Sequence, residues 1–186
     1  NVYACGNRAG QNNSLSERLK PGEMRIMLTW PLTSPQTASD LDSHLQIPDN
    51  ASGTHHIYYP EVSERYYYAT DNYTCPSCSS DQLSDNVTLD RDDDDGAPGT
   101  ETITITKVRS GTYSYSVVDY YRVNSASSTV LSKSGASVKV YYNNTTTTFN
   151  VPNSAGGLWR VFTFTTSGGL IASGNMSSAS NSGSVY

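Results

Sequence analysis

The sequence predicts an all-β protein, an antiparallel two-sheet sandwich of the jelly-roll or immunoglobulin-like kind with an extended N-terminal arm. Apolar and polar residues alternate with the period of two that half-buried strands show, most strictly in Thr102-Ile103-Thr104-Ile105-Thr106. Gly, Pro, Asn and Asp separate these short runs along the chain. No segment has a convincing helical period. A two-sheet sandwich accounts for this pattern.

The expected elements follow one another in a simple order. Residues 1–23 show no clear period and contain Gly, Asn, Ser and the Pro21-Gly22 pair, so they predict an extended arm. The body, residues 24–172, opens with an alternating strand at 24–30 that Pro31 ends. Residues 173–186 are rich in Ser and Gly and predict a flexible tail. Further strands are expected at 41–47, 54–59, 64–70, 87–90, 102–106, 111–121, 136–142, 146–151, 158–165 and 170–172.

The composition argues against several classes of protein. Twelve Lys and Arg against 17 Asp and Glu give a net charge of −5, whereas a protein that binds the nucleic-acid backbone needs a basic surface. No apolar run approaches the ~18–20 residues of a membrane-spanning helix, so no membrane span is expected. Charged residues make up only 16% of the chain, which argues against a coiled coil and against charge-driven disorder.

Asn-X-Ser/Thr sequons indicate an extracellular glycoprotein with covalent N-glycans. Some sequons arise by chance in a chain this rich in Asn, Ser and Thr, but nearly all of them lie in segments expected to be loops or tails. The chain also begins with Asn1 rather than Met, as a secreted protein does once its signal peptide is removed. We therefore expect a secreted or cell-surface protein. The acceptor residues are Asn12, Asn50, Asn72, Asn86, Asn143, Asn144 and Asn175.

The three cysteines predict one structural disulfide. Cys75 and Cys78 form a CxxC motif, but no second CxxC and no nearby His complete a zinc site. The motif lies in a loop rich in Ser, Pro and Asp, without the strand-then-helix context of a redox motif. The bridge joins either Cys75 with Cys78 or Cys5 with one of the two. The third thiol stays free or forms an intermolecular bridge.

Two acidic clusters predict a calcium site. Asp40-Leu41-Asp42 and the run from Asp90 to Asp95 hold seven of the twelve Asp residues. On a strand, Asp40 and Asp42 point to the same side about 7 Å apart. Dense carboxylate oxygens suit Ca²⁺, although the run lacks the spacing of an EF-hand, and a solvated acidic loop is the alternative. The candidate ligands are Asp40, Asp42, Asp90, Asp92, Asp93 and Asp95.

Ordered short motifs over roughly residues 24–166 resemble the YfaP-type extracellular domains. The most specific are Ser39-Asp40-Leu41-Asp42-Ser43-His44-Leu45 and Leu89-Asp90-Arg91-Asp92-Asp93. Further matches are Arg25 to Trp30, His56 to Tyr59, Glu101 to Ile105, Gly111-Thr112-Tyr113, Ser134 to Tyr141 and Trp159 to Phe162. The resemblance implies a β-sandwich of secreted and surface proteins with a calcium-holding acidic corner and no known catalytic activity.

The terminal segments have no counterpart in that family. An N-terminal arm, a jelly-roll-like body and dense glycosylation are together similar to the subunits of glycosylated extracellular fibrils found in fresh water. This second resemblance rests on architecture, and it implies a protein that assembles with copies of itself.

The residues give little indication of catalysis. No Gly-x-Ser-x-Gly motif is present, and His44, His55 and His56 are the only histidines. Two carboxylates could serve glycoside hydrolysis, but the Asp clusters have no Glu beside them in the sequence, which favours metal binding. Paired tyrosines such as Tyr120-Tyr121 suggest sugar stacking, although a strand would turn one ring of each pair inward.

The sequence therefore predicts a structural, non-enzymatic subunit of an extracellular glycosylated filament. Residues 1–23 of one subunit would add a strand to the next, or lie in a groove on it, through Val2 and Ala4 or Tyr3 and Cys5. Calcium would stiffen the body. The alternative is a calcium-dependent carbohydrate-binding or adhesion module.

Overall fold

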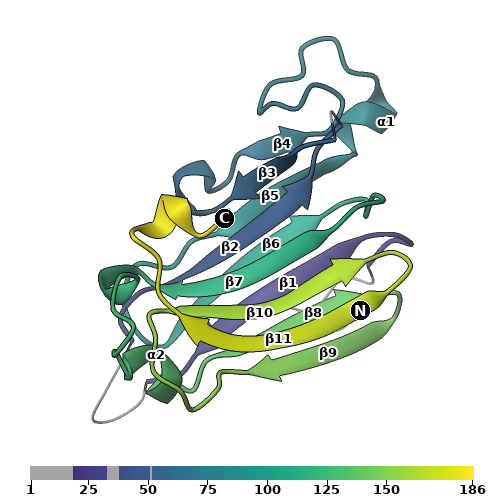
Figure 1. Cartoon of the computed structure of the whole chain (residues 1–186). Coiled ribbons are helices and arrows are strands. Elements are labelled where there is room, and N and C mark those ends of the chain that lie inside the picture. The colour runs from purple at the N-terminus through teal and green to yellow at the C-terminus, as the bar shows by residue number, and fades with distance from the viewer. Residues whose placement is uncertain (1–18, 33–37, 51) are drawn as a thin grey trace, which may run out of the picture.

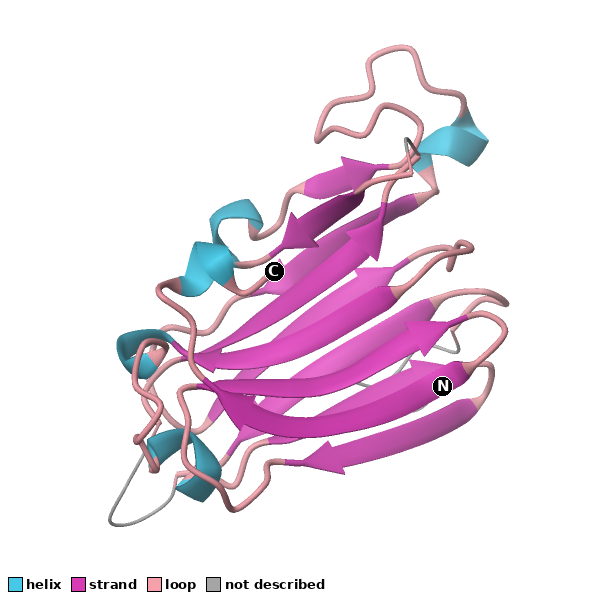
Figure 2. Cartoon of the chain, viewed as in Figure 1, coloured by secondary structure: helices cyan, strands magenta, loops and turns pink. Residues whose placement is uncertain are grey.

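Two antiparallel sheets packed face to face make up the protein in the computed structural model, which describes residues 19–32, 38–50 and 52–186 (Figures 1 and 2). This confirms the predicted two-sheet sandwich. The six-stranded sheet has the order β4-β5-β6-β1-β8-β9 and the five-stranded sheet the order β11-β10-β7-β2-β3. The strands are β1 (Met24–Trp30), β2 (Leu41–Pro48), β3 (Thr54–Ile57), β4 (Arg65–Tyr67), β5 (Asn86–Arg91), β6 (Gly99–Ile105), β7 (Tyr113–Asp119), β8 (Ser137–Tyr142), β9 (Thr145–Asn150), β10 (Leu158–Thr165) and β11 (Gly169–Ser177).

Single helical turns occupy several of the connections. They are α1 (Ser80–Leu83), α2 (Val130–Lys133) and the 3₁₀ turns η1 (Tyr59–Glu61), η2 (Tyr120–Arg122) and η3 (Ser182–Ser184). Two of them replace parts of expected strands. Pro60 cannot donate to a ladder, so β3 ends at Ile57 and a turn follows. None of the helices in the described ranges is long and apolar enough to cross a membrane.

The core lies between the sheets and follows the predicted alternation. In β1, Met24, Ile26, Leu28 and Trp30 are buried while the residues between them are partly exposed. The Trp30 ring lies directly over Gly99 in the neighbouring strand β6, and a Cβ atom there would come within 1.9 Å of the ring. Position 99 therefore requires glycine. β6 starts three residues before the expected strand because Gly99, Thr100 and Glu101 pair with Trp30, Thr29 and Leu28 of β1.

The C-terminal segment differs from the expected flexible tail. β11 continues to Ser177, five residues beyond the expected strand end at Ala172. Val185 is buried in a small cluster with Val118, Val123 and Leu158. The segment crosses the outer face of the five-stranded sheet (Figure 1) because its last two side chains bury apolar surface there. A composition dominated by Ser and Gly concealed these two anchoring residues.

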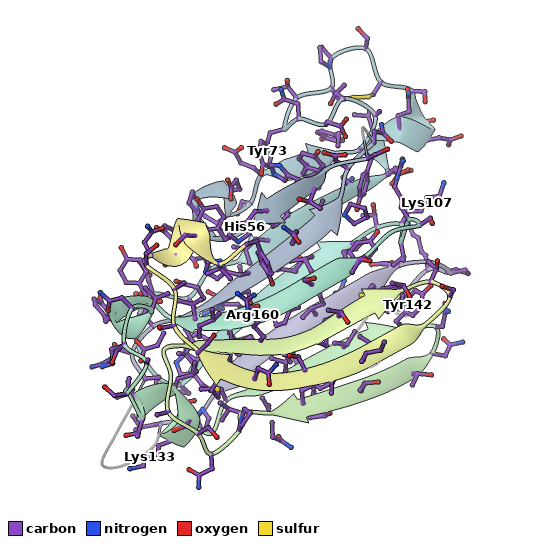
Figure 3. The ribbon with its side chains drawn as sticks, in the orientation of Figure 1. His56, Tyr73, Lys107, Lys133, Tyr142 and Arg160 are labelled. Atoms are coloured by element: carbon purple, nitrogen blue, oxygen red, sulfur yellow. A yellow bond between two sulfur atoms is a disulfide. The ribbon has the colours of Figure 1, made fainter. Side chains whose placement is uncertain are left out.

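The hydroxyl of Tyr186 completes this attachment. It donates to the carbonyl of Ser114 at 2.7 Å and bonds to Oγ of Ser116 at 2.9 Å, both in β7. The Arg160 guanidinium donates to the carbonyl of Val185 at 3.1 Å, and Figure 3 shows Arg160 on the same face of the sheet. Of the predicted arm, only residues 19–23 are described, and residues 1–18 lie outside the described ranges.

Candidate metal centre

Three carboxylates from both sheets meet at one end of the sandwich, where β2 and β6 begin and β5 ends. Asp42 comes from β2, Glu101 from β6, and Asp92 follows β5 directly. One oxygen from each of the three lies within 4.8 Å of the others. The sandwich architecture, rather than local sequence, therefore assembles this carboxylate cluster.

Alternation along β6 positions the Glu101 side chain. Glu101 shares the inward face of β6 with Ile103 and Ile105, so it points toward the five-stranded sheet. Its Oε2 atom accepts a hydrogen bond of 2.5 Å from the backbone N–H of Ser43 in β2. This bond joins the two sheets beside the cluster and fixes one oxygen of the carboxylate.

The cluster contains oxygen atoms that no protein group satisfies. Glu101 is 0% and Asp42 is 3% exposed, yet Oε1 of Glu101 and Oδ2 of Asp42 have no hydrogen-bond partner within the described residues. An ionised carboxylate buried without a partner costs several kcal/mol. A cation would remove this penalty by accepting the unpartnered oxygens as ligands.

Burial and mutual repulsion raise the pKa values of the acidic groups at this end. Burial, followed by the charges of Asp40 and Asp92, raises the pKa of Asp42 to about 8. Burial and the charges of Asp92 and Asp94 raise the pKa of Asp40 to about 6. Burial and the Asp42 charge raise the pKa of Glu101 well above its usual range. Without a cation, the cluster therefore retains protons at neutral pH.

The donor set is suited to a hard divalent ion. All the converging atoms are carboxylate oxygens, which Ca²⁺ and Mg²⁺ prefer, and within the described ranges no imidazole or thiolate joins them to add a preference for zinc or copper. Calcium accepts six to eight oxygens in irregular arrangements, whereas magnesium demands a near-ideal octahedron. Asp42, Asp92 and Glu101 would be the inner ligands. Asp40 lies close enough to influence the pKa of Asp42 and could complete the set with carbonyls and water. Asp119 is also near, but both of its oxygens accept from the Arg122 guanidinium at 3.3 Å.

The predicted ligands separate into two groups. Asp40, Asp42 and Asp92 belong to the acidic end of the sandwich, as expected. Asp93 instead forms an ion pair with Arg91 at 2.7 Å and accepts the N–H of Thr100 at 3.0 Å. Asp95 is exposed in the following loop and is not among the three converging residues.

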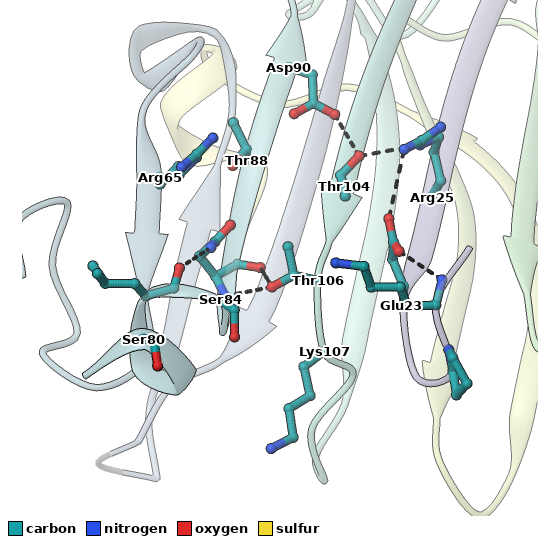
Figure 4. Close-up of a pocket in the computed structure, with 14 residues that line it drawn as sticks. Glu23, Arg25, Arg65, Ser80, Ser84, Thr88, Asp90, Thr104, Thr106 and Lys107 are labelled. Atoms are coloured by element: carbon teal, nitrogen blue, oxygen red, sulfur yellow. Dashed lines mark hydrogen bonds and ion pairs between the residues drawn. The ribbon is translucent and has the colours of Figure 1, made fainter. Parts of the chain in front are cut away.

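Asp90 faces the opposite side of the six-stranded sheet. It accepts a 2.6 Å hydrogen bond from the hydroxyl of Thr104, which also lies 3.4 Å from Nε of Arg25 (Figure 4). These residues line a polar groove of about 910 Å³ on the outer face of that sheet. The prediction placed Asp90 and Asp92 on one face of a strand, but β5 ends between them and the chain turns, so the two side chains diverge.

Sequence reasoning missed Glu101 and Asp119. Glu101 could have been found, because it occupies an inward position of the most regular alternating strand, where an acidic residue is out of place without a partner. Its position also corrects the expectation that no Glu lies beside the Asp clusters. Asp119, at the end of β7, gives no comparable signal, since only the pairing of β7 with β2 places it opposite Leu41.

The sequons differ in whether their amide groups are available. Asn86 is 4% exposed and its amide nitrogen donates to the carbonyl of Leu83 at 2.7 Å, so a glycan cannot be attached there without breaking this packing. The amide of Asn50 donates to the carbonyl of Tyr68. Asn12 lies outside the described residues. The exposed acceptors are Asn50, whose amide is held by Tyr68, and Asn72, Asn143, Asn144 and Asn175.

Cys75, Cys78 and the three histidines are not among the converging residues of the cluster. Cys75 and Cys78 form a disulfide, one of the expected pairings, while Cys5 lies outside the described residues. Nδ1 of His44 is 2.9 Å from Nε2 of His56, and burial lowers the pKa of both imidazoles, that of His56 to about 4. His55 instead stacks on Tyr66. His44 and His56 thus pack on the outer face of the five-stranded sheet, and His55 packs against a residue of the other sheet.

Comparison with known proteins does not assign the chain to a family. No family model matches the chain, and no curated protein is similar to it. Among solved structures, the chain is similar to a protein of unknown function, SAV2460, with a TM-score of 0.48 and 16% sequence identity over 84% of this chain and 92% of that one. A similarity at this level carries no argument about function. The resemblance to YfaP-type domains therefore stays an expectation from the sequence.

Proposed function

We propose that the chain is a structural, non-enzymatic subunit of an extracellular glycosylated filament, with a body stabilised by calcium at the carboxylate cluster. The observation that carries the proposal is the pair of unpartnered, buried oxygens of Asp42 and Glu101 at one end of the sandwich. A cation at that point would hold the two sheets together at one end. Such a clamp suits a protein that has to stay folded outside the cell.

Burial of the cluster favours a structural role over catalysis. The closeness of Asp42 and Glu101 is comparable with the carboxyl separation of about 5–5.5 Å in retaining glycosidases. However, a catalytic pair has to contact its substrate, and these two side chains are 3% and 0% exposed. A small ion, once bound, needs no such access.

The open edges of both sheets support the assembly part of the proposal. Within the described residues, β9 and β4 end one sheet, and β11 and β3 end the other. Unpaired backbone groups along an edge can accept a strand from another chain. A head-to-tail contact of this kind does not close on itself, so repeated contacts produce a fibre.

Electron microscopy of the purified full-length protein tests the assembly. We expect filaments in calcium, and monomers after deletion of residues 1–23. A protein that stays monomeric at high concentration, with or without these residues, would contradict the proposal. Replacing calcium with EDTA is expected to lower the thermal stability of the subunits, which separates the metal part of the proposal from the assembly part.

A carbohydrate-binding module is the second candidate, and an exposed tyrosine patch favours it. Tyr120 and Tyr121 are 42% and 65% exposed, and Tyr59 contacts Tyr120 with ring centroids 5.7 Å apart. The charges of Asp42 and Asp92 contribute to the raised pKa of Tyr59, so the patch borders the carboxylate cluster. Both rings of the Tyr120-Tyr121 pair are exposed because they lie in η2 and not in a strand.

Glycan-array binding tests this second candidate. Binding that both EDTA and Asp42→Ala abolish would support it, and Tyr121→Ala should weaken it through loss of ring stacking. Filament formation by a protein that binds no glycan on the array would contradict it.

A further inference from the structure

We infer that β9 is the edge that accepts a strand from a second copy of this chain, namely the uncharged segment at residues 1–5. This inference rests on the proposed assembly and names the surface that would carry it. Among the four edge strands of the described residues, β9 combines length, regularity and absence of charge.

The other three edges are less suited to pairing. β4 has three residues and β3 has four, so each offers few backbone groups. β11 is longer, but its pairing with β10 shifts register between Arg160 and Phe162, and Gly174 has a φ of +66°. Such irregularities protect natural edges against added strands.

By contrast, β9 has none of these protective features. Its sequence, from Thr145 to Asn150, contains no charged residue and no proline, and it pairs with β8 without a shift of register. Four of its six residues are threonine, which favours extended backbone. A strand of this kind offers about 20 Å of regular edge.

The turn before β9 indicates which backbone groups are free. Asn143 and Asn144 have φ of +49° and +61°, as in a two-residue type I′ turn, and Tyr142 pairs with Thr145 across it. In such a turn the residue after the loop donates its N–H to the carbonyl of the residue before the loop. The N–H of Thr145 thus points toward β8. Because direction alternates along a strand, the N–H groups of Thr146 and Thr148 point away from the sheet.

A groove beside β9 could receive the side chains of an added strand. It has a volume of about 470 Å³ and lies between the β8–β9 hairpin and the β10–β11 hairpin. Its apolar walls are formed by Val140, Tyr142, Phe164 and Leu170, and Thr145 and Thr147 line its rim. Figure 3 shows Tyr142 at this end of the sandwich. In the added strand, Tyr3 and Cys5 or Val2 and Ala4 would share one face.

The place where the arm leaves the body favours a second copy as the donor. Leu19 lies beside Asn143 and Asn144, at the first residue of β9. The residues that would first meet the edge of their own subunit, 13–18, include Glu17 and Arg18. The uncharged residues 1–5 are at the far end, and 18 extended residues reach up to about 60 Å. That length suits a neighbouring subunit.

Proline substitution at Thr148 tests the inference in the full-length protein with calcium. Thr148→Pro removes an outward N–H and adds a ring to the free edge, whereas Thr148→Val keeps the N–H and the β-branched shape. We expect Thr148→Pro to lower the affinity between subunits by about tenfold or more, measured by sedimentation, and Thr148→Val to assemble like the wild type. Thr146→Pro repeats the test at a second outward position, and circular dichroism confirms that each variant is folded.

The outcomes separate the inference from the proposed function. Filaments of normal length from both folded proline variants would overturn the assignment of β9 and leave the proposed assembly intact. A wild-type protein that does not assemble would overturn the proposed function itself. Hydrogen exchange that shows Thr146 and Thr148 protected by residues 1–18 within a monomer would identify the subunit's own arm as the occupant, and so overturn the second-copy donor.

Discussion

Replacing Asp42 by Asn should change stability in opposite directions with and without calcium. The buried carboxyl of Asp42 destabilises the metal-free protein, because folding brings it among other acidic groups. With calcium bound, the same carboxylate is a ligand. Asn keeps the shape of the side chain and removes the charge, so the variant should gain stability in EDTA and lose the stabilisation that calcium gives.

The raised pKa sets the magnitude. Asp42 ionises with a pKa of about 8 in the folded protein, against an ordinary value of 3.8. At pH 7 the folded state therefore retains a proton that the unfolded state has lost. This pH is about three units above the pKa of Asp42 in the unfolded chain. At about 1.4 kcal/mol for each unit, this costs on the order of 4 kcal/mol. We expect Asp42→Asn to recover about 2–4 kcal/mol in EDTA, since the neighbouring carboxyls remain.

Urea denaturation at pH 7 measures the effect, with each protein in EDTA and in millimolar calcium. Asp95→Asn is the matched control, since Asp95 is exposed and lies outside the three converging carboxylates. The control should behave like the wild type in both conditions. The reasoning would be refuted if Asp42→Asn were less stable than the wild type in EDTA, or if calcium stabilised it as much as it stabilises the wild type.

Further predictions concern pH, packing and glycosylation. The increase in unfolding free energy on adding calcium should grow from about pH 4 to pH 8. Over this range Asp42 ionises in the unfolded chain but keeps its proton in the folded metal-free protein, so the metal-free protein loses stability as the pH rises. Urea denaturation at several pH values, with and without calcium, measures this. Gly99→Ala should cost more than about 3 kcal/mol, measured by thermal unfolding, because the added carbon would overlap the Trp30 ring. Tyr186→Phe should cost about 1–3 kcal/mol and speed hydrogen exchange in the C-terminal segment, through loss of hydroxyl bonds. Asn86→Gln should leave the glycan mass of the secreted protein unchanged in mass spectrometry, since that amide is buried.

Local pattern was enough to predict most of the fold. The alternation in β1 and β6 depends on neighbouring residues only, and both strands were predicted from it. The C-terminal segment was different, because its attachment depends on Val185 and on the hydroxyl of Tyr186, and both act through residues far away in the sequence. Composition alone gave the wrong expectation there.

The carboxylate cluster shows the same division. Asp40, Asp42 and Asp92 could be predicted because acidic residues recur close together in the sequence. Glu101 joins Asp42 and Asp92 only through packing between the sheets, and Asp119 comes near them only through the pairing of β7 with β2, which a sequence pattern does not specify. Asp90 lies outside the cluster because of where β5 ends, which the sequence pattern likewise does not specify.

Calorimetric titration of calcium into the metal-free protein tests the central claim most directly. We expect one tight site, with release of at least one proton per calcium at pH 7, seen as a heat that changes with the ionisation enthalpy of the buffer, because the ion displaces protons held by Asp42 and Glu101. Absence of heat at millimolar calcium would contradict a calcium-stabilised body. Binding that Asp42→Asn leaves unchanged would place the ion elsewhere.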